Sequence, residues 1–171
     1  FNKITKIPTF CEFSMEFQYL IEPILKKKDC IIAISQSGKT IDTIESVKLA
    51  KKSKGCFCIA ITNHPDSELG EVSDYVIPLL CGEEKSVLAT KTYVNQLTVL
   101  AILTLEIANF RKTIKEEDYE QIFNELNSIP EKIINNFPKL HEKIKNYSNY
   151  FKFAEFCFIL GSGPDYATAM E

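Results

Sequence analysis

The sequence has 171 residues, of which 45% are hydrophobic and 25% charged, and this composition excludes a disordered chain. Its formal net charge of −3 gives no general electrostatic basis for binding nucleic acid or an anionic membrane. Any anion site must therefore be local. Six scattered cysteines form no CxxC pair and no cluster at metal spacing, so we expect no metal, no cofactor and a reducing, cytoplasmic compartment.

The first strong element is an apolar strand over residues 30–34. Before it, residues 7–10 predict a short strand, followed by a loop and a helix. After it, apolar residues recur at helical spacing over residues 40–54, and Gly55 is a suitable C-terminal stop.

Two further strands, over residues 56–61 and 75–80, enclose a turn-rich segment and a short helix near residues 68–71. Apolar strands that alternate with helices are typical of βαβ units. We therefore predict an α/β fold with a parallel sheet and helices on both faces. Ligands of such sheets bind at the C-terminal ends of the strands.

The rest of the chain is predicted to be mostly helical. A polar loop leads to an apolar helix over residues 87–109, which we expect to be central and largely covered. Its apolar run, residues 97–105, is shorter than a membrane span requires. Connecting helices over residues 116–135 and 138–150 precede a strand over residues 156–160.

The end of the chain resembles the opening of another α/β unit. A glycine turn at residues 161–164 follows the last strand, and a helix begins near Asp165. The chain also has no initiator Met, so we interpret it as a piece of a longer protein.

The junction at residues 35–40 carries the clearest chemistry. Its sequence SQSGKT places hydroxyl, amide and ammonium donors between a strand and a helix N-terminus, where a phosphate can bind. The plainer interpretation is a helix cap made by Ser or Thr. A Walker P-loop is excluded because Ala33 stands where its first Gly is required, and no GxGxxG motif is present.

Five segments, in one order, resemble SIS (sugar isomerase) domains. Residues 35–43 (SQSGKTIDT) resemble the family's SQSGETxDT, residues 59–67 (IAITNHPDS) its aITNxpxS, and residues 82–91 (GEEKSVLATK) its GPExxVASTK. Residues 16–19 (EFQY) are similar to its EFxY, and residues 161–171 to the start of a second SIS domain. Matches over nearly the whole chain make the resemblance specific.

The resemblance implies a flavodoxin-like three-layer α/β sandwich that binds a phosphorylated sugar, a hexose or aminohexose 6-phosphate. It implies three divisions: a first SIS domain without its first strand (1–112), connecting helices (113–150) and the opening of a second SIS domain (151–171).

The resemblance also implies a set of site residues. The phosphate-binding residues are Ser35, Gln36, Ser37, Gly38 and Thr40, and those close to the sugar are Glu84, Val87 and Ala89. Two positions depart from the family pattern, since Ala89 replaces a Ser and Glu83 a Pro.

The implied parent is a tandem-SIS phosphosugar isomerase or a fructosamine or aminosugar 6-phosphate deglycase, with a homodimer as the expected assembly. We identify no catalytic residue in the chain, because the family's candidate base follows a helix of which only residues 169–171 are present. Two alternatives stay open: a non-catalytic module that senses sugar phosphates in a regulator, and a structural half with a degenerate site.

Overall fold

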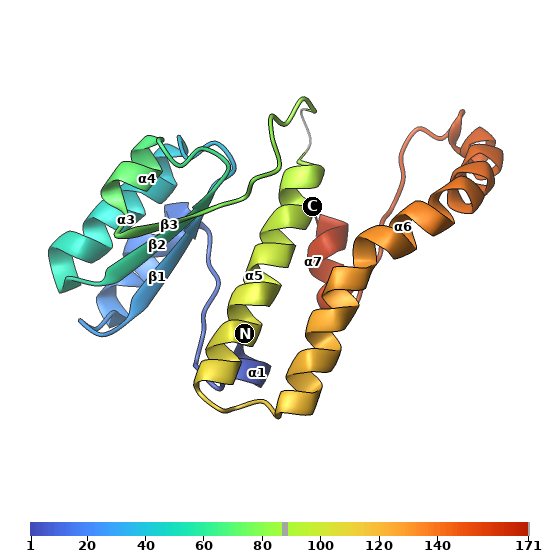
Figure 1. The fold of residues 1–171 in the computed structure, drawn as a ribbon. Helices are drawn as coiled ribbons and strands as arrows, with labels where there is room; N and C mark the ends of the chain where they lie inside the picture. Colours follow the sequence, from blue (N-terminus) through green and yellow to red (C-terminus); the bar gives the residue numbers. More distant parts are fainter. Residues whose placement is uncertain (87–88, 171) are drawn as a thin grey trace. The chain divides into compact units, whose positions relative to one another are not determined.

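The computed structural model describes residues 1–86 and 89–170 (Figure 1). It divides into two compact units, Phe1–Phe123 and Asn124–Glu171. Each unit is described below by itself. The first contains the sheet and all of the predicted site residues.

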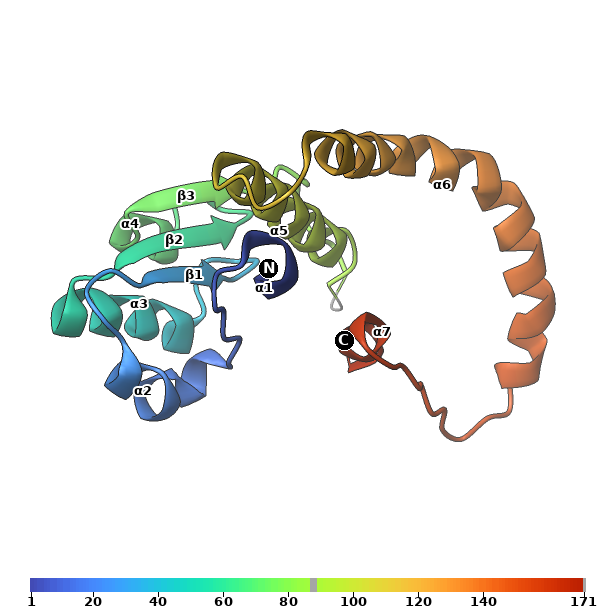
Figure 2. The ribbon, with the colours of Figure 1, turned by 90° about the horizontal axis from the view of Figure 1, so that it is seen from below.

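The first unit is built on a parallel sheet of three strands (Figure 2). The strands are β1 (Cys30–Ile34), β2 (Phe57–Thr62) and β3 (Tyr75–Pro78), in the order β1-β2-β3. Ala33 lies opposite Ala60 in the register. Short runs rich in Ile and Val favour strands, and the helical segments between them allow parallel pairing. The predicted α/β fold with a parallel sheet is confirmed.

Helices α3 (Ile41–Lys54) and α4 (Glu68–Val72) pack against one face of the sheet. The core on this face includes the fully buried side chains of Val47, Cys58 and Leu69. Their burial supplies the main favourable contribution to the stability of this unit. The strand ends and the turns that carry the site are therefore fixed to a packed scaffold.

Helix α5 (Lys91–Phe110) lies on the other side of the sheet from α3 and α4 (Figure 1). The prediction that this helix is largely covered is wrong for the described chain. Thr92, Thr104, Leu105 and Ala108 are buried, whereas Val94 is 54% exposed. At 20 residues, α5 is long and apolar enough to cross a bilayer, so the predicted shortfall in length does not hold for the whole helix. Core helices of soluble proteins satisfy the same criterion.

The N-terminal segment is helical where a strand was predicted. It contains α1 (Asn2–Thr5), two 3₁₀ turns and α2 (Phe17–Leu20). Residues 7–10 form no strand, because Lys6 turns the chain in the left-handed region and Thr9 bonds locally to the Ile7 carbonyl. No strand lies beside the free edge of β1 in the described residues.

The second unit contains most of α6 (Glu116–Phe151) and α7 (Pro164–Met170). The two predicted connecting helices are one continuous helix, with Pro130 and Pro138 inside it. A proline keeps a helical φ and removes one hydrogen bond, so it kinks a helix without always ending it. The predicted strand over residues 156–160 is not formed, because a strand needs a ladder partner and the described part of this unit has none.

Candidate functional site

The segment that we name the cradle loop, residues 35–40, begins where β1 ends. The Ser35 amide donates to the Ile61 carbonyl at 3.1 Å and so continues the pairing of β1 with β2. Ser35 and Gly38 are buried, and Thr40 is exposed at the start of α3. The loop therefore lies at the C-terminal edge of the sheet, where ligands of parallel sheets bind.

Hydroxyl groups organise the interior of the cradle loop. The Ser35 and Thr40 hydroxyls lie 2.8 Å apart, and the Ser35 Oγ also accepts from the Gly38 amide at 3.1 Å. The Ser37 Oγ accepts from the Lys39 amide at 3.2 Å. These bonds fold the loop into a compact turn. The turn brings together three of the predicted donors, the hydroxyls of Ser35, Ser37 and Thr40.

The cradle loop is also bonded to the turn that follows β2. The Gln36 carbonyl accepts from the Asn63 amide at 3.1 Å and from the Thr62 hydroxyl at 3.3 Å. Two donors on one carbonyl fix the backbone at Gln36. The loop conformation is therefore supported by residues outside the predicted phosphate site.

Gly38 makes the closest contact between the loop and that turn. Its φ of +63° lies in the left-handed region, and a Cβ at this position would overlap the Ser67 hydroxyl. Its carbonyl accepts from the Leu69 amide at 3.1 Å. The Ser67 Oγ is buried and has no hydrogen-bond partner among the described residues. Only glycine fits this position without displacing the turn.

The N-terminus of α3 carries no cap from its own N-cap side chain. Thr40 is the N-cap, but its hydroxyl bonds to Ser35 and makes no capping bond to the helix. The first amides of a 14-residue helix thus point toward the cradle loop with a partial positive charge. Such an end, next to three hydroxyls, is chemically suited to an oxyanion.

A second loop, the β3–α5 loop (described residues 79–86 and 89–90), is attached to the same turn. The Asn63 side chain donates to the Gly82 carbonyl at 2.6 Å and accepts from the Cys81 amide at 3.3 Å. The Leu79 amide donates to the Thr62 carbonyl at 2.9 Å. Asn63 therefore joins the two loops, since its own backbone amide bonds to the cradle loop.

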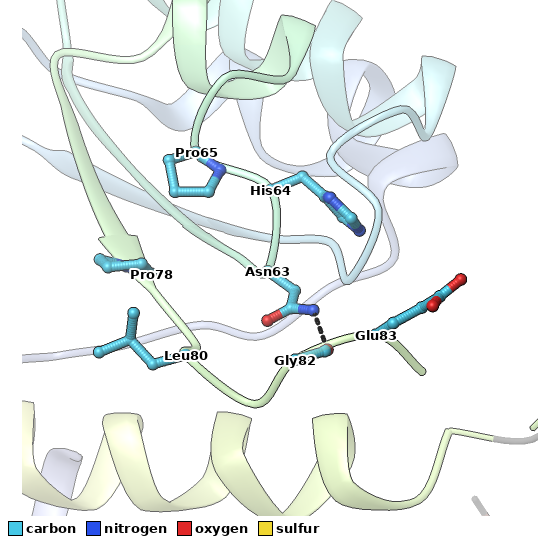
Figure 3. A pocket seen from close by; sticks show the side chains of 7 residues that line it. All are labelled: Asn63, His64, Pro65, Pro78, Leu80, Gly82 and Glu83. Carbon is cyan, nitrogen blue, oxygen red and sulfur yellow. Dashed lines mark hydrogen bonds between the residues drawn. The ribbon is translucent and has the colours of Figure 1, made fainter. Parts of the chain in front are cut away.

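A depression of about 510 Å³ lies between this turn and the β3–α5 loop (Figure 3). In Figure 3 the Asn63 amide points at Gly82, while His64 and Glu83 extend to the same side. Its lining residues are Asn63, His64, Pro65, Pro78, Leu80, Gly82 and Glu83. The depression is therefore mainly apolar, with polar groups along one wall.

Glu84 closes the far part of the β3–α5 loop onto α5. One carboxylate oxygen accepts from the Thr90 hydroxyl, and the other from the amides of Thr90 and Thr92 and from the Thr92 hydroxyl, all at 3.1 to 3.2 Å. These bonds favour the ionised form and lower the pKa of Glu84 to about 2. Glu84 is thus a carboxylate that caps the first turn of α5.

The predicted site residues fall into two groups in the structure. The cradle loop brings together Ser35, Gln36, Ser37, Gly38 and Thr40. Glu84 lies in the other loop with its carboxylate bonded to α5, and Ala89 is half-buried just before that helix. Val87 lies outside the described residues.

Two residues with a clear structural part were not predicted as site residues, Asn63 and Ser67. Both lie in the segment that resembles aITNxpxS, in the turn that follows β2. The signal that could have identified them is the presence of polar side chains in a turn next to the predicted phosphate loop. Asn63 connects two loops, which cannot be read from local sequence because its partners lie far along the chain.

The described residues offer little else of chemical interest. In residues 1–86 and 89–170, no group of three or more His, Cys, Asp or Glu side chains could hold a metal ion. Burial raises the pKa of Cys58 to about 12, so its thiol is neutral at physiological pH. The chemistry of the described site therefore rests on hydroxyls, amides and one capping carboxylate.

The chain is similar in sequence and in fold to proteins that are already known. The SIS domain family matches residues 1–106. A glutamine–fructose-6-phosphate aminotransferase (isomerizing) of Bacteroides thetaiotaomicron is 39% identical over 97% of the chain, and one of Thermotoga maritima is 38% identical over 98%. The chain spans only 26% and 27% of the length of these relatives.

A solved structure with a similar fold also belongs to an aminotransferase of this kind. The C-terminal domain of a glucosamine–fructose-6-phosphate aminotransferase from Francisella tularensis has a TM-score of 0.79 and 32% sequence identity. The match covers 90% of this chain and 43% of that one. Sequence and fold thus agree on one group of relatives.

Proposed function

The chain belongs to the SIS domain family, and from this premise we propose that its cradle loop binds the phosphate of a phosphorylated sugar. The observation that carries the proposal is the helix α3, whose N-cap side chain bonds to Ser35 instead of capping the helix. A phosphate would accept from the first amides of α3 and from the Ser37 hydroxyl. It would also accept from the hydroxyls of Ser35 and Thr40, whose mutual bond would open so that both can donate. Gln36 would add its side-chain amide.

The sugar that we propose is a hexose or aminohexose 6-phosphate. Relatives such as the aminotransferase of Bacteroides thetaiotaomicron carry fructose 6-phosphate in their names. Because the chain spans about a quarter of their length, we assign their type of reaction to the longer parent protein only as a proposal. We propose a parent that is a phosphosugar isomerase, aminotransferase or deglycase, and a role for this chain in binding the substrate without supplying the catalytic base.

The remaining parts of the proposal concern organisation. We propose that residues 1–112 form the first SIS domain, that residues 113–150 connect it and that residues 151–171 open a second one. A cytoplasmic homodimer is the assembly that we propose. It is supported by the exposed apolar side chains of α5, such as Val94 and Leu97, which a second copy would cover.

Calorimetric titration of the wild-type chain tests the binding proposal. Fructose 6-phosphate and glucosamine 6-phosphate are compared with fructose and glucosamine, and we expect binding only of the phosphorylated sugars. Ser37→Ala should weaken binding about tenfold to a hundredfold, as expected for the loss of one hydrogen bond to a charged group. Ser53→Ala, which removes an exposed hydroxyl from α3, is the matched control and should change nothing.

Two outcomes would contradict the proposal. The first is equal binding of the phosphorylated and unphosphorylated sugars, since it would show that the phosphate is not recognised. The second is an unchanged affinity in Ser37→Ala. A sensing module would bind in the same way, so turnover by a longer protein that contains this chain separates an enzyme from a sensor.

A further inference from the structure

Glu84 accepts an extensive set of hydrogen bonds. Its two carboxylate oxygens accept four hydrogen bonds, two from backbone amides and two from hydroxyls, and all four donors belong to Thr90 and Thr92. The hydroxyl of Thr92 is fully buried. The carboxylate therefore joins the middle of its loop directly to the first turn of α5, the helix that follows the loop.

The same loop is tied down at its other end. Asn63 holds the backbone of Cys81 and Gly82, and the Asn63 backbone is bonded to the cradle loop through Gln36. Figure 3 shows the Asn63 amide reaching Gly82. A continuous series of bonds therefore runs from the cradle loop through Asn63 to residues 81–82, and Glu84 continues it to α5.

The geometry points to Glu84 as a positioning residue that sets the distance between the β3–α5 loop and the cradle loop, and so the affinity for the sugar part of the ligand. This inference rests on the proposed function. Ala89, which the family resemblance places beside the sugar, lies directly before Thr90, one of the two residues that Glu84 holds. The role that we assign to Glu84 is this positioning, and it requires no contact between the carboxylate and the sugar.

Glu84 also makes the N-termini of α3 and α5 different from each other. The N-terminus of α5 already holds a carboxylate, so a second anion there would meet like charge. The N-terminus of α3 has no such group from its own cap. We therefore expect an added phosphate at the N-terminus of α3.

Two variants separate the geometry of Glu84 from its charge. Glu84→Ala removes all four bonds, whereas Glu84→Gln keeps an oxygen for the amides and an amide that can donate to the Thr90 hydroxyl. Glu71→Ala is the control, because it removes an exposed carboxylate from α4 in the same unit. Circular dichroism and thermal unfolding of each variant establish that the chain is folded.

Amide hydrogen exchange, measured by NMR without ligand, tests the positioning directly. In Glu84→Ala we expect exchange at Thr90 and Thr92 to be at least about tenfold faster than in the wild type, since a bond to a charged acceptor is lost at each. Glu84→Gln should restore most of the protection, and Glu71→Ala should leave it unchanged. Unchanged exchange in Glu84→Ala would overturn the inference.

Calorimetry then uses two probes, fructose 6-phosphate and inorganic phosphate. In Glu84→Ala the affinity for fructose 6-phosphate should fall about fivefold or more, because a smaller fraction of the chain holds the loop in place, whereas that for phosphate should stay within about twofold. Glu84→Gln should recover most of the loss.

The outcomes distinguish the two proposals. Wild-type affinity of Glu84→Ala for fructose 6-phosphate would overturn the positioning role and leave the proposed function intact. Equal weakening of both probes would also overturn it, since Glu84 would then support the phosphate site itself. A wild-type chain that binds neither probe would overturn the proposed function, and the role of Glu84 in sugar binding with it.

Discussion

The helices α3 and α5 both follow a strand and a polar loop, but the amides at their N-termini differ in whether a side chain of the protein binds them. At α5 the first turn is filled by an internal carboxylate, Glu84. At α3 the N-cap hydroxyl of Thr40 turns back to Ser35 and leaves the helix uncapped by that residue. The first arrangement stabilises a loop, and the second leaves partial positive charge available to an anion from outside.

Of these two helix ends, only the N-terminus of α3 is left for an external anion, because the chain itself fills that of α5. The residue types around both ends are similar, since each has Thr, Lys and a nearby acidic residue. What differs is the position of the acidic group. Glu84 is six residues before Thr90 and returns to it through a loop, whereas Asp42 is inside the first turn of α3.

The largest expected effect comes from breaking the cradle loop at Gly38. Gly38→Ala should lower the free energy of unfolding by about 3 kcal/mol, because it adds left-handed strain, about 1 kcal/mol, to an overlap with the Ser67 side chain that costs about 2 kcal/mol. Binding of fructose 6-phosphate should be lost. Urea unfolding and calorimetry measure the two effects.

Gly55→Ala is the matched control for this substitution. Gly55 has nearly the same φ, +65°, but a Cβ there meets nothing within 4 Å. Gly55→Ala should therefore lower the free energy of unfolding by the backbone strain alone, about 1 kcal/mol, and should bind fructose 6-phosphate normally. The double variant Gly38→Ala/Ser67→Gly removes the overlapping Ser67 atoms, so it should recover most of the stability that Gly38→Ala loses beyond Gly55→Ala. If it does not, the overlap is not the cause of that additional loss.

A carboxylate at Thr40 would make α3 resemble α5. Thr40→Asp caps the helix and places a negative charge where we propose the phosphate, so the affinity for fructose 6-phosphate should fall roughly thirtyfold, or about 2 kcal/mol. Thr40→Asn also caps but carries no charge, and its loss should be clearly smaller. Equal losses in the two variants, measured by calorimetry, would show that charge at this helix end is unimportant.

The pH dependence of stability reports on the filled N-terminus of α5. Glu84 has a folded pKa of about 2 against an ordinary value of 4.5, so its stabilising effect is complete above pH 4.5 and is lost as the pH falls toward 2. The gap in unfolding free energy between the wild type and Glu84→Gln should shrink over that window. Asp74, whose pKa is lowered by Lys51 and by the Cys58 amide, is common to both proteins and cancels. A constant gap in urea titrations would contradict this.

The smallest effect is expected at Lys39. Its side chain is exposed at the end of the cradle loop, where water and salt screen its charge. Lys39→Ala should therefore weaken the binding of fructose 6-phosphate by less than about threefold, and that small loss should disappear in 0.5 M salt, because ions at about this concentration screen exposed charges over a few ångströms. A loss as large as that of Thr40→Asp would mean that Lys39 contacts the phosphate directly.

Local sequence predicted the elements that are held by local patterns. Apolar runs, turn residues and a C-terminal glycine predict the strand at Cys30–Ile34, the cradle loop and the helix that ends just before Gly55. The parallel sheet follows from the alternation of strands and helices. These features depend on neighbours within about one element, so the sequence contains the information that fixes them.

The predictions that were wrong, and the contacts that were missed, concern structure that depends on residues far away in the sequence. Residues 7–10 and 156–160 are apolar enough for strands, but a strand exists only beside another strand. The bonds of Asn63 to a loop that begins 16 residues later, and the closure of Glu84 onto Thr92, are likewise set by tertiary structure. Helix α6 continues through Pro138 although a proline there removes one hydrogen bond, so this local signal did not mark the end of the helix.

The contact between Gly38 and Ser67 has a consequence for how this site can change over generations. Two positions 29 residues apart share one small volume, so a larger residue at either is tolerated only if the other gives way. Since position 38 also requires a left-handed backbone, the freedom lies at position 67 alone. New ligand preferences can therefore be expected to arise at the exposed rim, at Lys39 and in the β3–α5 loop, while the floor of the site stays as it is.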